Sequence, residues 1–416
     1  MINRMKLFFS NEKVLFNENK IKYIFSTIII ISIGLLSFML PGLSYTFLHK
    51  IPLLHAGLLS LMIIVYLFLY QKIFIDKYII SMLLFCFVIL ISSLINDPRQ
   101  IGQTEFLLTT LFIMLYEFMS AKEHKNKSIY SIYLGLCLFV LYFFVSYFKE
   151  IISLDIGRLG RLFGNENAIG QYFCLGYILN LYLGITRKNY PLIVTLPFFA
   201  IFGALTGSKL FLIMLILVTI AFIIMFFGRK KWYWSVIIIT CTLAIIIGVL
   251  QLKMFLMLKE RILDMIRLLV GRSSSIDMST ITRYNMFFEG IYLFTFKPLL
   301  GWGANGFAIN GAYQTYSHST ISELLCNFGL IGFVSFCLPV VFSICEKKSK
   351  DTKTISIMLI IFILCKTIFG VAFSAKNFYI SLAMLCSCLH TNSILTYDKR
   401  RKPNKTMSLQ DQTTLV

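Results

Sequence analysis

Long apolar runs separated by short polar segments dominate the chain. A bilayer-spanning helix needs about 20 mostly apolar residues, and twelve runs approach or exceed that length. They cover residues 23–40, 53–70, 78–95, 102–119, 129–148, 168–186, 190–206, 208–227, 232–250, 319–344, 354–374 and 376–395. These runs lack the alternation of apolar and polar residues that barrel strands require. The pattern therefore predicts an all-α polytopic integral membrane protein with about 12 transmembrane helices.

The same pattern predicts one long loop outside the membrane, between the ninth and tenth helices. Residues 253–270 place charged side chains along one helical face with an apolar remainder, which is typical of a helix lying on a bilayer. Residues 282–297 predict a second, partly apolar helix. The expected organisation is a cytoplasmic segment (1–22), helices 1–9 (23–250), an extracytoplasmic loop (251–318), helices 10–12 (319–395) and a cytoplasmic tail (396–416).

Composition and charge agree with this topology. Of 416 residues, 58% are hydrophobic and only 14% are charged, which excludes a soluble enzyme. A net charge of +20 would suggest nucleic acid in a soluble protein, yet 24 of the 39 basic residues fall in the predicted cytoplasmic segments. That bias is the positive-inside rule. It predicts a multi-pass plasma or inner membrane protein with both termini in the cytoplasm and no nucleic-acid partner.

The remaining basic residues need a local reason. Fourteen lie in predicted exterior segments, half of them in the long loop, and Arg158 and Arg161 lie between the fifth and sixth helices. An anionic ligand at the outer face is one explanation, and a snorkelling interfacial helix is the other. The ten cysteines lie in or at the ends of predicted helices, so neither a disulfide framework nor a metal site is expected.

Two motifs in the exterior segments each allow two interpretations. Gly301, Gly303 and Gly306 match G-x-G-x-x-G, but no βαβ unit surrounds them. A tight glycine turn is favoured over a phosphate-binding turn. His318 stands at the outer mouth of the tenth helix, where it is either a proton acceptor or an interfacial histidine. Glu323 is interpreted as the last residue of a capping box with Thr320, and therefore as structural.

Four motifs in order carry a family resemblance. Arg158-Leu-Gly-Arg161-Leu-Phe-Gly-Asn165-Glu-Asn167 comes first, and Thr206-Gly-Ser-Lys209 second. Arg283 with Lys297-Pro-Leu-Leu-Gly-Trp-Gly303 is third, and His318-Ser319 with Gly329-Leu-Ile-Gly332 is fourth. The set resembles the bacterial O-antigen polymerase and O-antigen ligase superfamily, which includes capsular polysaccharide polymerases. Glu166, Lys209 and Ser319 depart from the proline, arginine and asparagine that are usual in that family.

The resemblance implies a glycosyltransferase that works at the outer face without a metal or cofactor. Its substrate would be an oligosaccharide linked to polyprenyl diphosphate, transferred to the hydroxyl of another lipid-linked repeat unit. His318 would be the base, with Arg283 and Arg158 binding the diphosphate. Substrate contacts would come from further polar and basic residues: Arg161, Lys209, Arg272, Asn165, Asn167 and Lys366.

Several alternatives stay open. Arg158 and Arg161 cannot be ranked from the residues alone, and the motifs do not separate a polymerase from a ligase. A lipid-linked oligosaccharide flippase also needs about twelve helices and buried cations, but it would show internal repeats that are not evident here. Besides the lipid-linked substrate and the bilayer, a chain-length regulator is a partner that the resemblance leaves open.

Overall fold

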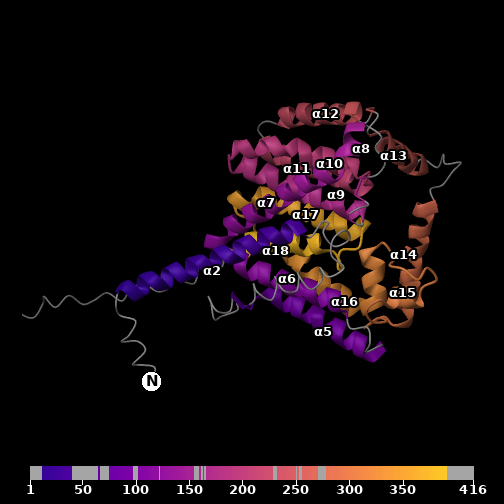
Figure 1. Ribbon diagram of the computed structural model, residues 1–416. Coiled ribbons are helices and arrows are strands. Elements are labelled where there is room, and N and C mark those ends of the chain that lie inside the picture. Colours follow the sequence, from indigo (N-terminus) through magenta and orange to yellow (C-terminus); the bar gives the residue numbers. More distant parts are fainter. Residues whose placement is uncertain are drawn as a thin grey trace, which may run out of the picture.

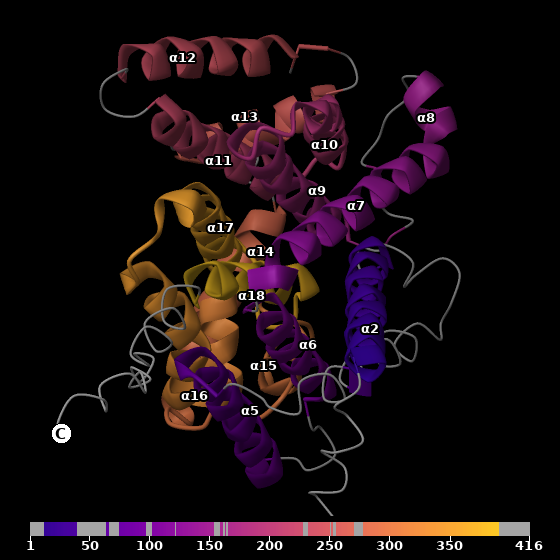
Figure 2. The same ribbon diagram turned by 90° about the vertical axis from the view of Figure 1, so that its left-hand side faces the viewer.

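The computed structural model is a bundle of helices (Figures 1 and 2). It describes residues 12–39, 64–65, 75–96, 102–120, 122–153, 159–160, 163, 165–227, 232–249, 251–252, 255–269 and 278–390. Within these residues all regular structure is helical, so the predicted all-α class is confirmed for the described part of the chain. The tail (396–416) lies outside the described residues, as does the predicted second helix (53–70) except for residues 64–65.

The helices follow the predicted apolar runs closely. Those that coincide with predicted membrane helices are α2 (Glu12–Met39), α5 (Lys77–Asn96), α6 (Gln103–Ser120), α7 (Lys122–Ser146), α9 (Glu166–Asn180) with η2 (Leu181–Thr186), η3 (Tyr190–Thr195) with α10 (Leu196–Leu205), α11 (Lys209–Phe227), α12 (Trp232–Val249), α16 (Thr320–Cys345), α17 (Lys350–Phe369) and α18 (Lys376–His390). Among the residues that the structure describes, six helical segments are long and apolar enough to cross a membrane: residues 77–96, 124–146, 166–186, 209–227, 320–345 and 352–369. The fold is therefore that of an all-α membrane protein.

Helices also occupy the predicted exterior segments. A short α8 (Phe148–Ser153) follows α7, and the long loop contains α13 (Leu256–Leu269), α14 (Met278–Phe296) and α15 (Gly306–Asn310). α13 and α14 lie where the sequence predicts an amphipathic and a partly apolar helix. In Figure 1, α14 runs along the right-hand edge, across the direction of the candidate span α11.

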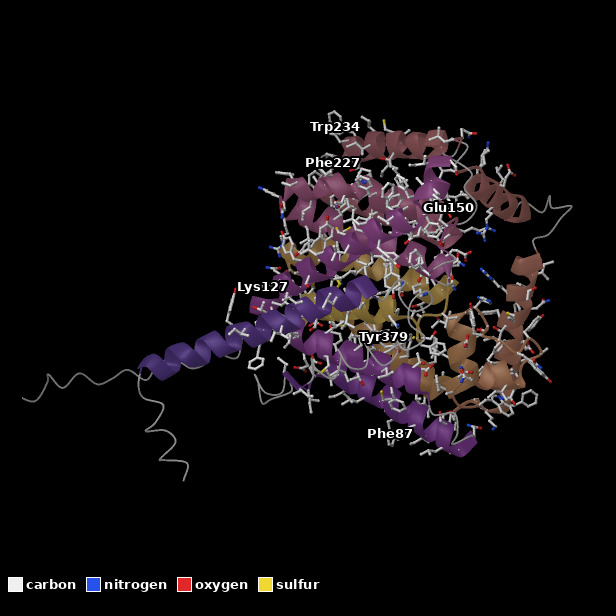
Figure 3. The ribbon with its side chains drawn as sticks, viewed as in Figure 1. Phe87, Lys127, Glu150, Phe227, Trp234 and Tyr379 are labelled. Carbon is white, nitrogen blue, oxygen red and sulfur yellow. The ribbon has the colours of Figure 1, made fainter. Side chains whose placement is uncertain are left out.

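Aromatic side chains fill much of the interior. Phe163, just before α9, packs against Phe139, Tyr142, Phe143 and Tyr147 of α7 and the residue after it, with ring centroids 5.5–5.9 Å apart. Figure 3 shows the contrast between the outside and the inside of the bundle. Phe87 and Trp234 lie on its outer surface and are half exposed, whereas Tyr379 of α18 is buried in its centre. Exposed apolar side chains on the spans are expected of helices that face lipid.

Contacts between helix ends show which ends lie together. At one end, which we call the site end, the Leu159 N–H donates to the Leu205 carbonyl, and the Thr320 N–H donates to the Gly370 carbonyl. Asn377 at the start of α18 donates to Gln171 near the start of α9 (3.0 Å). These are the helix ends that the sequence places outside. The structure thus gathers the predicted exterior ends on one side of the bundle.

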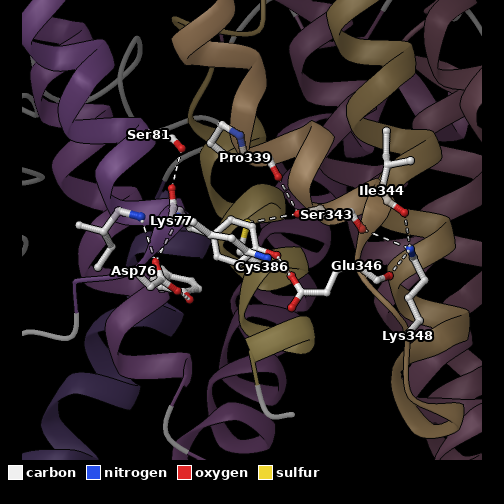
Figure 4. A network of polar contacts seen from close by, with 12 residues as sticks. Asp76, Lys77, Ser81, Pro339, Ser343, Ile344, Glu346, Lys348 and Cys386 are labelled. Carbon is white, nitrogen blue, oxygen red and sulfur yellow. Dashed lines mark hydrogen bonds and ion pairs between the residues drawn. The ribbon is translucent and has the colours of Figure 1, made fainter. Parts of the chain in front are cut away.

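A polar network fastens the opposite end (Figure 4). The Lys77 Nζ at the start of α5 lies 2.7 Å from Glu346 Oε2 at the end of α16, and the Tyr78 hydroxyl donates to the same oxygen (2.5 Å). The Lys348 Nζ donates to the carbonyls of Ser343, Ile344 and Glu346, which caps the last turn of α16 with positive charge. α5 and α16 are therefore joined at this end by an ion pair.

α16 is broken at Gly329, and the turn after α14 fills the break. Gly329 has φ +65° and ψ −167°, so the helix cannot make its own bonds across this point. The N–H groups of Leu330 and Ile331 donate instead to the carbonyls of Pro298 (2.8 Å) and Leu299 (3.3 Å). In exchange, the carbonyls that they would have used in a continuous helix accept from the turn: Cys326 from Trp302 (2.9 Å) and Asn327 from Gly303 (2.8 Å).

This exchange explains the glycines of the third and fourth motifs. A Cβ on Gly329 would lie 2.2 Å from the Leu299 carbonyl oxygen, and one on Gly301 2.5 Å from the backbone of Asn327. The N–H groups of Gly301, Trp302, Gly303, Gly306 and Phe307 all donate to oxygen atoms of the chain. They cannot also hold a phosphate, so the tight-turn interpretation of G-x-G-x-x-G is confirmed for these groups.

Gly329→Ala should destabilise the protein by several kcal/mol, because it adds a backbone clash to a left-handed φ that alone costs about 1–3 kcal/mol. We expect a clear drop in the midpoint of thermal unfolding of the purified protein in detergent. Gly248→Ala on α12 is the matched control, since no atom lies within 4 Å of its added Cβ. Equal midpoints for the two variants would show that the break at Gly329 does not depend on glycine.

Candidate functional site

His318 lies in a short turn that enters α16 at the site end. Its φ is +59°, a left-handed conformation that is uncommon for a residue with a Cβ. The side chain is half buried and lies against the exposed Tyr316, with ring centroids 4.2 Å apart. Strained backbone of this kind persists only where surrounding contacts hold it. The contacts that hold it here come from the residues on either side of His318.

Glu323 provides those contacts. Its Oε2 accepts hydrogen bonds from the Ser317 N–H (2.9 Å) and the Ser317 hydroxyl (3.0 Å), while the Ser319 N–H lies 3.2 Å from the Ser317 hydroxyl. The predicted capping box is therefore wrong in its partners. The N-cap of α16 is Ser319, and the Glu323 carboxylate reaches back to Ser317 rather than to Thr320. Glu323 closes a loop of six residues around His318.

Thr320 is engaged elsewhere. Its hydroxyl donates to the Gly370 carbonyl and accepts from the Ala372 N–H (2.7 Å). These bonds tie the start of α16 to the turn between α17 and α18. The capping pattern failed because this tertiary contact offered the threonine hydroxyl better partners than its own helix did.

Arg283 on α14 lies close enough for its charge to act on His318. Gly290, two turns further along α14, packs directly on Ser322, where an added Cβ would lie 2.9 Å from the serine Cβ. Burial, and after it the positive charge of Arg283, lowers the pKa of His318 to about 4. The imidazole is therefore neutral at neutral pH and able to accept a proton. The structure thus brings the charge of a predicted cation within range of the predicted base.

Lys366 joins the same region from α17. It is buried, and its Nζ would lie 3.7 Å from a Cβ on Gly370, whose carbonyl binds Thr320. No hydrogen bond or ion pair of Lys366 is found among the described residues. Lys366 is thus a buried cation close to the start of α16, two residues after His318.

The first and second motifs meet in a separate part of the site end. Leu159 bonds to Leu205, as described above, and Gly170 of α9 packs on Thr206 and Ser208, with an added Cβ 3.0–3.1 Å from their side chains. Lys209 begins α11 beside this turn and is partly buried. Arg158, Arg161 and Arg272 lie outside the described residues, so their positions stay predictions.

Asn165 already has a structural task. Its side-chain oxygen accepts from the N–H groups of Asn167 (2.9 Å) and Ala168 (3.3 Å), which caps the first turn of α9. Capping accounts for the asparagine in the first motif without a ligand. Asn167 lies in the first turn of α9 and is partly buried.

Sequence reasoning missed Arg261. This residue of α13 donates from Nη1 to the Gly207 carbonyl (2.7 Å) and so fastens the amphipathic helix onto the second motif. The charge pattern gave no signal for Arg261, because the charged face that it predicted for this helix contains Glu260 and not Arg261. Gly207 lies in the turn before α11 and has φ +63°, a left-handed conformation that glycine adopts readily.

Comparison with known proteins supports the resemblance. The family model for O-antigen ligases matches residues 192–337. This region runs from η3 to the middle of α16 and contains Lys209, Arg283, the Pro298–Gly303 turn and His318. The resemblance to the O-antigen polymerase and ligase superfamily is therefore confirmed across that region. Proteins of the matched family are glycosyltransferase-like enzymes that act on lipid-linked sugars. No curated protein matches the chain.

The low pKa of His318 gives a measurable expectation. Between about pH 6.5 and 4 the unfolded chain takes up a proton at this residue that the folded protein does not, so this group makes the fold less stable as the pH falls. Carbethoxylation of His318, followed by mass spectrometry against pH, should give a half-maximal rate near pH 4. In Arg283→Gln the half-point should rise toward 6.5. An unchanged half-point would show that the two side chains do not interact.

Proposed function

We propose that the protein polymerises a polysaccharide from repeat units linked to polyprenyl diphosphate, at the outer face of a bacterial cell membrane. The observation that carries the proposal is the half-buried His318, held in a turn by the Glu323 carboxylate and within range of the Arg283 charge, in the region that resembles O-antigen ligases. A glycosyl transfer from diphosphate needs a base for the acceptor hydroxyl and cations for the leaving group. The site end has both.

In the proposed reaction, His318 removes the proton from the acceptor hydroxyl as its oxygen attacks the anomeric carbon. The bond from that carbon to the diphosphate oxygen breaks, and the diphosphate leaves as an anion. Arg283 offsets its charge, with Lys366 contributing from α17 and Arg158, Arg161, Arg272 and Lys209 from the other motifs. Because these side chains supply the positive charge, the proposed step requires no bound metal.

Donor binding would also prepare the base. Arg283 lowers the pKa of His318 while its charge is uncompensated. A bound diphosphate would balance that charge and raise the pKa of His318 by the part due to Arg283, while the larger part of the lowering, which comes from burial, would stay. A stronger base would then be present only when the donor is in place.

The decisive experiment compares polysaccharide size ladders from cells that carry the wild type, His318→Ala or Arg283→Ala at equal membrane levels. Loss of a general base typically costs about 10²–10⁴ in rate, so both variants should leave single lipid-linked repeats on the outer leaflet. Tyr313→Phe, an exposed residue of the same loop, is the control and should keep a normal ladder.

Other outcomes of that experiment would decide against the proposal. Repeats that accumulate on the cytoplasmic leaflet would indicate a flippase instead. Full-length polymer that is made but not joined to its final acceptor would indicate a ligase. An unchanged ladder in both variants would remove His318 and Arg283 from the site.

Lys366→Met tests the buried cation separately. The substitution keeps the length and the apolar stem but removes the charge, so the fold should be kept while the polymerisation rate falls at least about tenfold, as for loss of a charge-assisted contact of about 1.5–3 kcal/mol. Turnover should be measured with purified protein and lipid-linked repeats. Full activity would show that Lys366 does not contact the leaving group.

A further inference from the structure

One face of α14 is lined with exposed aromatic side chains. Tyr284, Phe288, Tyr292 and Phe296 follow at four-residue intervals and are 51–64% exposed. Neighbouring rings contact each other, with centroids 4.7 Å apart for Tyr284 and Phe288 and 5.0 Å apart for Tyr292 and Phe296. A contiguous apolar stripe of this size is unusual on a surface that meets only water.

The other face of α14 is fully occupied by the protein. Met286 and Leu293 are buried with Phe307 and Cys326 in a small cluster against which Trp302 packs. The Trp302 indole N–H donates to the Leu293 carbonyl (2.9 Å), which fixes the rotation of α14 about its axis. The aromatic stripe is therefore held outward by the packing behind it.

The stripe continues directly onto a candidate membrane span. Beyond Phe296 the chain reaches Leu299, which is 63% exposed and whose carbonyl accepts from the Ile331 N–H. Ile331, Leu330 and Val334 are exposed apolar residues of α16, a helix long and apolar enough to cross a membrane. Lys297 lies between the two surfaces in the chain, but its ammonium group is engaged by the protein: it donates to Asn96 and lies 4.0 Å from the centre of the Trp302 ring. Two apolar surfaces joined in this way belong in the same solvent, and for a span that solvent is lipid.

We propose that the aromatic face of α14 lies in the bilayer leaflet at the site end, as an interfacial helix. α14 is not itself a candidate span, and it runs across the direction of α11 (Figure 1), as expected of a helix lying along the membrane surface. Tyrosine and phenylalanine rings suit the boundary between headgroups and acyl chains. The proposal concerns a lipid surface and does not depend on the proposed enzymatic function.

This placement sets the depth of Arg283. The arginine directly precedes Tyr284 on an exposed part of α14, so a lipid-facing stripe would hold its guanidinium at the level of the phosphate headgroups. A cation at that depth meets the diphosphate of a membrane-bound substrate without lifting it from the bilayer.

Quenching of added tryptophans tests the proposal. The variants Phe288→Trp and Tyr292→Trp are placed in phosphatidylcholine vesicles with or without brominated acyl chains. For each variant, the emission of the added tryptophan is the difference from the parent protein in the same vesicles. Tyr313→Trp, exposed in the segment between α15 and α16, is the control. Brominated lipid should lower the added emission at 288 and 292 at least about twofold, and aqueous iodide should quench only the tryptophan at 313.

Two results would overturn the proposal. If iodide quenches positions 288 and 292 as strongly as position 313 while brominated lipid does not, the face lies in water and is free to meet a glycan. If neither quencher reaches them, the face is covered by protein, such as a second copy of the chain. A second position keeps the test valid if one variant misfolds. A midpoint of thermal unfolding equal to that of the parent confirms that a variant is folded.

Discussion

The exchange of hydrogen bonds at Gly329 organises the site end of the molecule. A helix broken in a low-dielectric environment would leave two N–H groups and two carbonyls unpaired, at a cost of several kcal/mol each. The turn 298–303 removes that cost by taking the place of the missing helical turn. In doing so it fixes where α14 ends, how α14 rotates and therefore where Arg283 lies relative to His318. The turn that contains His318 is held separately, by the bonds of Glu323 to Ser317.

The sequence predicted the fold well because lipid imposes a simple rule. Each apolar run had to be a helix, and for the described part of the chain the runs and the helices coincide to within a few residues, apart from the extended N-terminal parts of α2 and α7. Even the two helices expected in the long loop, α13 and α14, appear at their predicted places. The predicted number of membrane crossings, about twelve, is a stronger claim than the positions of the helices. In the described part of the chain, six helices are long and apolar enough to cross a membrane.

The candidate site was predictable in part. The residues of the third and fourth motifs meet in space, because the glycines are required where two backbones touch. The partners of Glu323 and Thr320 could not be predicted, since a capping pattern reports only on its own helix and both side chains bond outside it. Arg261 left no local signal at all, because its partner is the backbone of Gly207, 54 residues earlier in the chain. Contacts to backbone carbonyls carry no residue signature.

The junction at Gly329 also constrains how the protein can be made. The Ser92 hydroxyl of α5 donates to the Leu300 carbonyl, and the Asn96 amide donates to the Gly301 carbonyl (3.0 Å), more than 200 residues away in each case. α5 must therefore enter the membrane with these polar groups still lacking their final partners. At typical rates of about 5–20 residues per second, the ribosome needs on the order of ten seconds or more to deliver them. Biogenesis thus includes an interval in which the polar side chains at the C-terminal end of α5 can form hydrogen bonds only with water, lipid headgroups or the insertion machinery.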